Sequence, residues 1–125
     1  MSQKNYKRQS EVSLEENLKK AVTELLILHL LSERDCYIGE IAKGIGEKSD
    51  GALKIVFPYT AIYRMEEVGH IRELPKRIAP DGRRRQYFSI TPEGRTYLSH
   101  LKTVYANVSS GIARILATEA EPKEA

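Results

Sequence analysis

The chain has 125 residues, of which 41% are hydrophobic and 30% charged, and its formal net charge is +3. This length and composition are typical of one globular domain and exclude a second independent core. No apolar run approaches the roughly 20 residues that a membrane helix needs, and the polar N-terminus does not resemble a secretory leader. The single cysteine excludes an internal disulfide and a multi-thiolate zinc site. We therefore expect a cytoplasmic protein without a metal or other cofactor.

The positive charge is concentrated in residues 71–95, which hold seven basic and three acidic side chains and so carry +4. The other hundred residues together carry −1. A local basic cluster is the electrostatic footprint of a nucleic-acid contact. A solvated loop could carry the same net charge without binding a partner. The predicted structure around the basic cluster therefore has to separate the two interpretations.

The N-terminal region predicts an arm followed by a helix. Residues 1–12 are polar and without periodicity, which favours a flexible arm. Residues 13–16, Ser-Leu-Glu-Glu, have the form of a capping box and place the start of a helix at Ser13. After Thr23 the helix is apolar on nearly every side until residues 32–35, so we expect other elements to cover it.

Two shorter helices are expected next. The first covers about residues 38–47 and has one apolar face. The second begins near Pro58, a residue suited to the first helical position, and ends at Gly69. Its predicted inner side includes Ile62 and Met65, and its outer side holds Thr60, Tyr63, Arg64 and Glu67.

A β-hairpin is predicted after these helices. Residues 71–78 and 83–90 are its expected strands, and the Ala-Pro-Asp-Gly sequence at 79–82 is typical of a turn. Pro75 indicates that the first strand lies at an edge or is interrupted there. In the second strand, alternation places Arg85 on the face opposite Gln86.

The final helix is predicted over residues 92–118, with Thr91 as N-cap and Pro92 at the first helical position. Residues 119–125 are expected to form a disordered tail. The apolar positions of the helix recur at spacings of three and four, a heptad pattern that favours dimerisation. Packing back on the first helix is the alternative, and both arrangements can hold together. The residues are Leu98, Leu101, Tyr105, Val108, Ile112 and Ile115.

The predicted fold class is mainly α with a β-hairpin. Three helices, a hairpin and a long helix are the layout of a winged helix-turn-helix over residues 13–91, followed by a C-terminal dimerisation helix. In this architecture the third helix enters the DNA major groove and the hairpin lies beside it on the backbone or in the minor groove. The basic segment falls on that hairpin, so charge and element order both favour a nucleic-acid partner.

Three stretches carry motifs: residues 63–71 read Tyr-Arg-Met-Glu-Glu-Val-Gly-His-Ile, residues 83–94 read Arg-Arg-Arg-Gln-Tyr-Phe-Ser-Ile-Thr-Pro-Glu-Gly, and residues 25–41 include Glu40-Ile41. Together they resemble the PadR family of bacterial transcriptional regulators. The first resembles the signature that closes the family's recognition helix, the second its wing strand and the start of the following helix, and the third its first two helices. The likeness covers roughly residues 20–100, and the single C-terminal helix resembles the short branch of the family.

DNA contacts are expected from two sets of residues. Phosphate contacts are assigned to Lys54 and to the hairpin, where alternation favours Arg83 and Arg85 over Arg84. Base contacts are assigned to hydroxyl and guanidinium groups on the outer side of the third helix. Tyr59 is included, with core packing as its alternative. The full set is Lys54, Tyr59, Thr60, Tyr63, Arg64, Lys76, Arg77, Arg83, Arg84 and Arg85.

A dimer sets two recognition helices about one DNA turn apart and so predicts a palindromic operator. The resemblance further implies a repressor that a small hydrophobic or aromatic effector releases. We expect its site between the first and last helices, with core or interface packing as the alternative for each residue. The candidates are Leu26, His29, Leu30, Leu101, Tyr105 and Val108.

An enzyme is not expected, because the histidines are scattered, Cys36 is alone, and no Gly-rich phosphate loop or paired-carboxylate motif occurs. The expected partners are double-stranded DNA, a second copy of the chain and the effector, with no membrane. The alternative function is a winged-helix interaction module whose basic hairpin binds an acidic protein.

Overall fold

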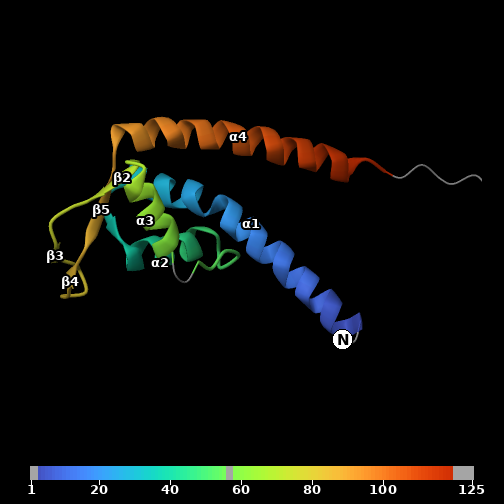
Figure 1. Ribbon diagram of the computed structural model, residues 1–125, viewed down its shortest axis with the longest axis horizontal. Helices are drawn as coiled ribbons and strands as arrows, with labels where there is room; N and C mark the ends of the chain where they lie inside the picture. The colour runs from blue at the N-terminus through green and yellow to red at the C-terminus, as the bar shows by residue number, and fades with distance from the viewer. Residues whose placement is uncertain (1–2, 56–57, 120–125) are drawn as a thin grey trace, which may run out of the picture.

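The computed structural model describes residues 3–55 and 58–119, with the side chains of residues 14–55 and 58–119. It begins with the helices α1 (Gln3–Glu33), α2 (Ile38–Lys48) and α3 (Tyr59–Glu67), and a short strand, β1 (Cys36–Tyr37), precedes α2. The strands β2 (Ile71–Glu73), β3 (Arg77–Ile78), β4 (Arg84–Arg85) and β5 (Tyr87–Ile90) follow, and then α4 (Pro92–Ala117). Figure 1 shows α2 and α3 packed beside the C-terminal part of α1, with the strands at one end of the molecule.

The strands confirm the predicted hairpin and the winged-helix fold class. Among the described residues, β1-β5-β2 form one antiparallel sheet and β3-β4 form a second. The hairpin is thus divided into two ladders, and Pro75, which has no N–H to donate, lies in the gap between β2 and β3. We call residues 71–90 the wing and residues 77–85 the wing tip. Figure 1 shows the wing tip projecting from the body on the side away from α4.

The core lies where α1 meets α2, α3, the three-stranded sheet and the first turns of α4. The side chains of Ile27, Leu28 and Leu31 in α1 are at most 1% exposed. Other elements of the same chain cover this part of α1 on several sides. This explains why the helix is apolar on nearly every side here. The residues packed around it include Ile41, Ile45, Ile62, Met65, Ile71, Phe88, Ile90 and Leu98.

The end of α3 is joined to the start of α4. Gly69 takes a left-handed conformation (φ +84°), and its carbonyl accepts a hydrogen bond from the Thr91 hydroxyl at 2.6 Å. The same Thr91 oxygen accepts the N–H of Gly94 at 3.0 Å and so caps α4. A Cβ at Gly94 would lie 2.0 Å from the His70 carbonyl oxygen, so only glycine fits this close approach. The orientation of α3 is therefore tied to that of α4.

The structure corrects the predicted N-terminal boundary. α1 begins at Gln3, so the helix start predicted at Ser13 is wrong and residues 3–12 of the predicted flexible arm (residues 1–12) are helical; residues 1–2 lie outside the described part of the chain. Residues 3–12 are rich in Gln, Lys, Arg and Glu and contain neither Gly nor Pro, and nothing in that composition opposes a helix. A Ser-x-x-Glu sequence also occurs inside helices. Of the predicted tail over residues 119–125, residues 120–125 lie outside the described part of the chain.

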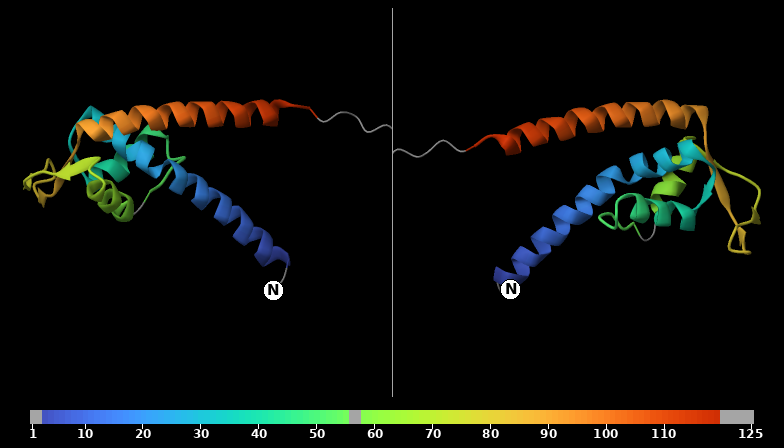
Figure 2. Two further views of the ribbon diagram at one scale, coloured as in Figure 1. Left: turned by 45° about the horizontal axis from the view of Figure 1, so that its top comes forward. Right: turned by 180° about the vertical axis from the view of Figure 1, so that it is seen from behind.

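The two long helices diverge from the compact end of the molecule. α4 packs against the C-terminal part of α1, and both views of Figure 2 show the helices separating toward their free ends. Neither of them, nor any other helix of the described residues, is long and apolar enough to cross a bilayer.

Candidate nucleic-acid interface

Helix α3 has a buried side and an exposed side, as the sequence predicts. The side chains of Ile62 and Met65 are fully buried and fix the helix on the core. Thr60, Tyr63 and Arg64 lie on the exposed side. Apolar packing on one side therefore holds the predicted base-contacting groups toward solvent on the other.

Tyr59 lies on the surface rather than in the core, with 43% of its area exposed. Its ring centroid is 6.3 Å from that of Tyr63, which is 57% exposed. The two rings form one aromatic surface at the N-terminal end of α3, on the side where Thr60 is also exposed.

Arg64 binds a carboxylate of α1. Its Nε and Nη2 atoms both lie 3.0 Å from Glu24 Oε1, and the two side chains are 63% and 24% exposed. An exposed ion pair of this kind contributes about 0–1 kcal/mol. A DNA contact of similar strength can therefore replace it. Sequence patterns did not indicate this pair because its members are 40 positions apart.

Lys54 is exposed in the segment before α3. It lines a hollow together with Lys19 and Lys20 of α1. Lys19 forms an ion pair with Glu15 at 3.2 Å, which reduces the net charge it contributes. Lys20, which the sequence motifs did not indicate, is exposed beside Lys54 and extends the basic surface onto α1.

The wing tip carries exposed cations around a tight turn. Arg83 and Arg84 are exposed and, among the described residues, form no ion pair through their side chains. Asp81 shapes the turn because its Oδ1 accepts the backbone N–H of Arg83 at 3.0 Å. Gly82 follows with a left-handed backbone (φ +82°). Arg84, which the alternation argument ranked below Arg85, is thus fully at the surface.

Arg77 and Arg85 point toward aromatic rings. The Arg77 guanidinium lies 3.8 Å from the ring centroid of Tyr87, and that of Arg85 lies 5.1 Å from the ring centroid of Tyr37. Arg85 Nη2 also lies 2.6 Å from Asp81 Oδ2. This hydrogen bond lowers the pKa of Asp81 and raises that of Arg85. Arg85 therefore packs on Tyr37 while Arg84 is exposed; which of the two contacts DNA stays a prediction.

The predicted dimerisation face of α4 divides into two parts. Leu98 is buried against the core and Leu101 is half-buried, so these two follow the alternative of packing within one chain. Farther along the helix the same face is open to solvent, with exposures between 51% and 73%. The exposed members are Tyr105, Val108, Ile112 and Ile115.

The structure places a cleft between α1 and α4, but its α1 wall differs from the prediction. Leu101, Tyr105 and Val108 line it as expected from α4. The α1 wall consists of Ala21, Val22, Glu24 and Leu25 rather than the predicted Leu26, His29 and Leu30. Sequence periodicity does not select the α1 wall, because the apolar residues of α1 occur on nearly every side and do not define one face. The effector site itself stays a prediction.

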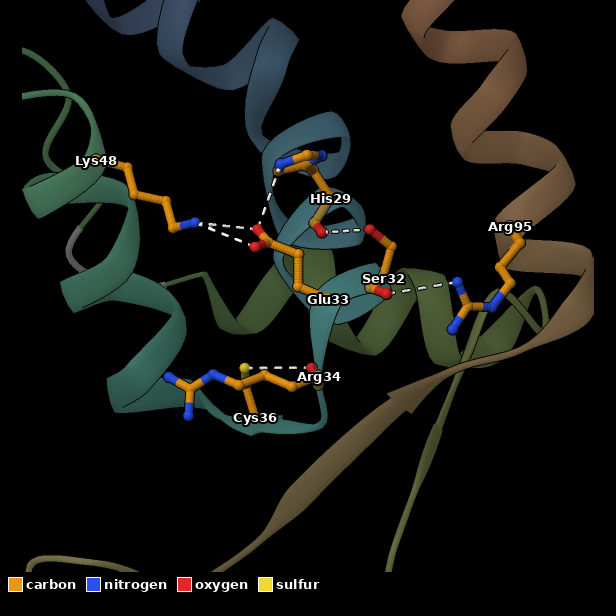
Figure 3. Close-up of polar contacts among 7 residues, drawn as sticks. All are labelled: His29, Ser32, Glu33, Arg34, Cys36, Lys48 and Arg95. Carbon is orange, nitrogen blue, oxygen red and sulfur yellow. Dashed lines mark hydrogen bonds and ion pairs between the residues drawn. The ribbon is translucent and has the colours of Figure 1, made fainter.

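His29 belongs to a polar junction at the end of α1, shown in Figure 3. Its Nε2 lies 3.4 Å from Glu33 Oε1, and Lys48 Nζ of α2 lies 3.1 Å from the same oxygen. The Lys48 contact lowers the pKa of Glu33. On the other side of α1, Arg95 of α4 donates to the Ser32 carbonyl oxygen at 3.5 Å. This junction ties α1 to α2 and α4 outside the cleft.

Comparison with solved structures finds this architecture in transcriptional regulators. A PadR-like transcriptional regulator from Bacillus cereus aligns with a TM-score of 0.70 and 23% identity, over 82% of this chain and 99% of that one. A transcriptional regulator from Clostridium thermocellum aligns with a TM-score of 0.68 and 29% identity, over 82% and 99%. A PadR family transcription regulator from Clostridium difficile aligns with a TM-score of 0.65 and 31% identity, over 77% and 99%.

The family assignment rests on sequence as well as on fold. A comparison with curated proteins finds no match. The transcriptional regulator PadR-like family matches residues 27–100, which contain α2, α3, the wing and the ends of α1 and α4 that pack on them. This is more than half of the chain, and the motifs at residues 63–71 and 83–94 fall inside it. The chain therefore belongs to the PadR-like family of transcriptional regulators.

Proposed function

We propose that this protein is a non-enzymatic, cytoplasmic repressor that binds a palindromic operator as a homodimer and is released by a small hydrophobic or aromatic effector. The observation that carries DNA binding is the place of the positive charge. The net charge of +4 in residues 71–95 falls on the wing. Arg85 of the wing and Tyr59 of α3 line the same hollow, so the wing lies next to α3. A basic wing beside an exposed recognition helix is the DNA-binding surface of this architecture.

The two parts of this surface have different tasks. Thr60, Tyr63 and Arg64 present hydroxyl and guanidinium groups that suit base edges in the major groove. Lys54, Lys76, Arg83 and Arg84 are among the exposed cations and suit phosphates, which supply affinity without sequence preference. Residues 13–91 thus act as the DNA-binding domain.

The proposed dimer interface is the apolar face of α4 over residues 92–118, together with α1. Tyr105, Val108 and Ile112 are more than half exposed, as are Leu14 and Leu18 on α1. A second copy is the occupant that an a/d pattern on such a face favours. Val108→Asp places a charge in this face and is expected to give monomers in sedimentation experiments, whereas Lys102→Ala on the same helix is expected to leave the dimer intact.

The effector proposal rests on the cleft between α1 and α4. The cleft is lined mainly by apolar side chains, and Glu24 lines it while also binding Arg64 of α3. A ligand that holds α1 in the arrangement in which Glu24 binds Arg64 keeps a proposed base-contacting residue away from DNA. Differential binding to the two arrangements is what such release requires.

The test is retention of a DNA fragment from upstream of the protein's own gene at low salt, repeated with candidate aromatic metabolites. Binding that falls steeply as salt increases, and that an effector reverses, supports the proposal. Absence of binding by the purified dimer at low salt contradicts it. That result would favour the alternative, in which the wing binds an acidic protein.

A further inference from the structure

We propose that Arg77, Arg85, Asp81 and the rings of Tyr37 and Tyr87 form a brace that sets the position of the wing tip, so that Arg77 and Arg85 are positioning residues rather than phosphate contacts. We call these five residues the wing brace. The functional part of this inference rests on the proposed DNA binding.

The wing tip needs a brace because its own pairing is short. β3 and β4 pair through Arg77↔Arg85 and Ile78↔Arg84, and the Ala79 N–H adds one backbone hydrogen bond to the Arg83 carbonyl oxygen at 2.8 Å. Leu74 still donates its N–H to the Tyr87 carbonyl oxygen, and Pro75, Lys76 and Gln86 separate this ladder from the three-stranded sheet. A short two-stranded ribbon is marginal by itself in water. Ile78 adds little apolar support, since its side chain is 67% exposed.

The aromatic half of the brace is fixed to the body. Tyr87 is 4% exposed in β5, and Tyr37 in β1 is its ladder partner across the sheet. The two rings meet edge to face, with centroids 5.5 Å apart. Each ring then receives one guanidinium from the wing tip, Arg77 on Tyr87 and Arg85 on Tyr37. Cation–π contacts of this geometry join the tip to the sheet.

The polar half of the brace links the turn to the same contacts. Asp81 Oδ2 lies 2.6 Å from Arg85 Nη2, while Oδ1 accepts the Arg83 backbone N–H. One carboxylate therefore ties the turn to the arginine that rests on Tyr37. Arg85 Nε is shielded from solvent and has no hydrogen-bond partner among the described residues. This edge of the guanidinium does not face the outside, where a phosphate would lie.

The brace also stands between the wing and α3. Tyr37 and Arg85 line a hollow whose other walls include Tyr59, the first residue of α3, and Gly39 and Ala42 of α2. Loosening the contact between Arg85 and Tyr37 therefore changes the spacing between the wing tip and the recognition helix. That spacing decides whether Arg83 and Arg84 reach phosphates while α3 occupies the groove.

The decisive variant is Asp81→Asn, because electrostatics and the brace predict opposite results. The substitution removes a negative charge from the wing, so a purely electrostatic wing binds DNA more tightly. Asparagine still accepts the Arg83 N–H but loses the charged contact with Arg85. The brace predicts binding weakened by about fivefold, the factor that corresponds to one lost contact of this class. It also predicts faster hydrogen exchange at the wing tip, including the Ala79 N–H that pairs with Arg83.

Tyr37 supplies a matched pair that carries no charge. Tyr37→Phe keeps the ring face and is expected to retain DNA affinity within about twofold, whereas Tyr37→Leu is expected to lose about fivefold with an unchanged salt dependence. Arg84→Ala is the contrasting variant, and it is expected to reduce the salt dependence without changing exchange at Ala79. Thermal unfolding of each variant shows whether the body remains folded.

The outcomes separate this inference from the proposed function. Asp81→Asn that binds DNA equally well or more tightly, with unchanged exchange at the wing tip, overturns the brace. If the unmodified protein does not bind DNA, the proposed function fails. The exchange measurement on Asp81→Asn and Tyr37→Leu then still decides whether the brace positions the wing tip.

Discussion

The recognition helix and the wing tip belong to one proposed DNA surface but are held in place by different forces. α3 is anchored by Ile62 and Met65, which are fully buried in the core. The wing tip is held by Asp81 and Arg85, which are 38% and 35% exposed, and by cation–π contacts. Salt does not screen apolar burial, whereas it screens exposed charge contacts. The helix is therefore placed by folding itself, and the wing tip by contacts that solution conditions can loosen.

The largest effect expected from this comparison concerns stability. Ile62→Ala is expected to lower the free energy of unfolding by about 2–5 kcal/mol, because it leaves a cavity between α3 and the core. Ile78→Ala removes a similar side chain from the wing tip, where 67% of it is exposed, and is expected to change that free energy by less than about 0.5 kcal/mol. Urea unfolding measures both. Equal losses would show that the wing tip is part of the core after all.

The sequence predicted α3 well because its signals are local. Pro58 and Gly69 mark its ends, and the periodicity of its apolar residues separates the buried side from the exposed one. The same holds for the cap of α4 at Thr91. The start of α1 differs from the prediction because the Ser-x-x-Glu motif at residues 13–16, which resembles a helix N-terminus, lies inside a continuous helix here.

The wing brace could not be predicted from local patterns. Strand alternation correctly separates Arg84 from Arg85 but does not say which side faces the body. That depends on Tyr37, which belongs to the two-residue strand β1, too short to show any alternation. The ion pair between Glu24 and Arg64 was missed for the same reason, since tertiary packing alone brings its members together.

An intermediate effect is expected at the contact between α1 and the recognition helix. Glu24→Gln removes the charge that holds Arg64 and is expected to tighten DNA binding by up to about fivefold, the equivalent of about 1 kcal/mol for an exposed pair. Fluorescence anisotropy with a labelled operator measures the change. Glu15→Gln is the control, because Glu15 pairs with Lys19 rather than with Arg64 and its substitution removes the same charge from α1. Equal changes in DNA affinity for both variants would show that only the charge removed from α1 matters, and not the contact between Glu24 and Arg64.

The smallest effect is expected at Cys36, a buried residue of β1, the strand that pairs with β5 of the wing. Burial raises the pKa of this thiol. A raised folded-state pKa contributes stability that is present below the ordinary thiol pKa and is lost as pH rises through the raised value. Unfolding experiments from neutral to alkaline pH are expected to show a small decline that Cys36→Ala lacks. An identical decline in both proteins would assign it to other groups.

The central claim is that the exposed cations of the wing contact DNA phosphates while α3 contacts bases. The most direct test is the salt dependence of affinity for one operator fragment, compared between the unmodified protein and the double variant Arg83→Ala/Arg84→Ala. We expect the slope of log affinity against log salt to become shallower by about 1.8, from about 0.9 per phosphate contact, with a similar loss of affinity for unrelated DNA. An unchanged slope would contradict the account.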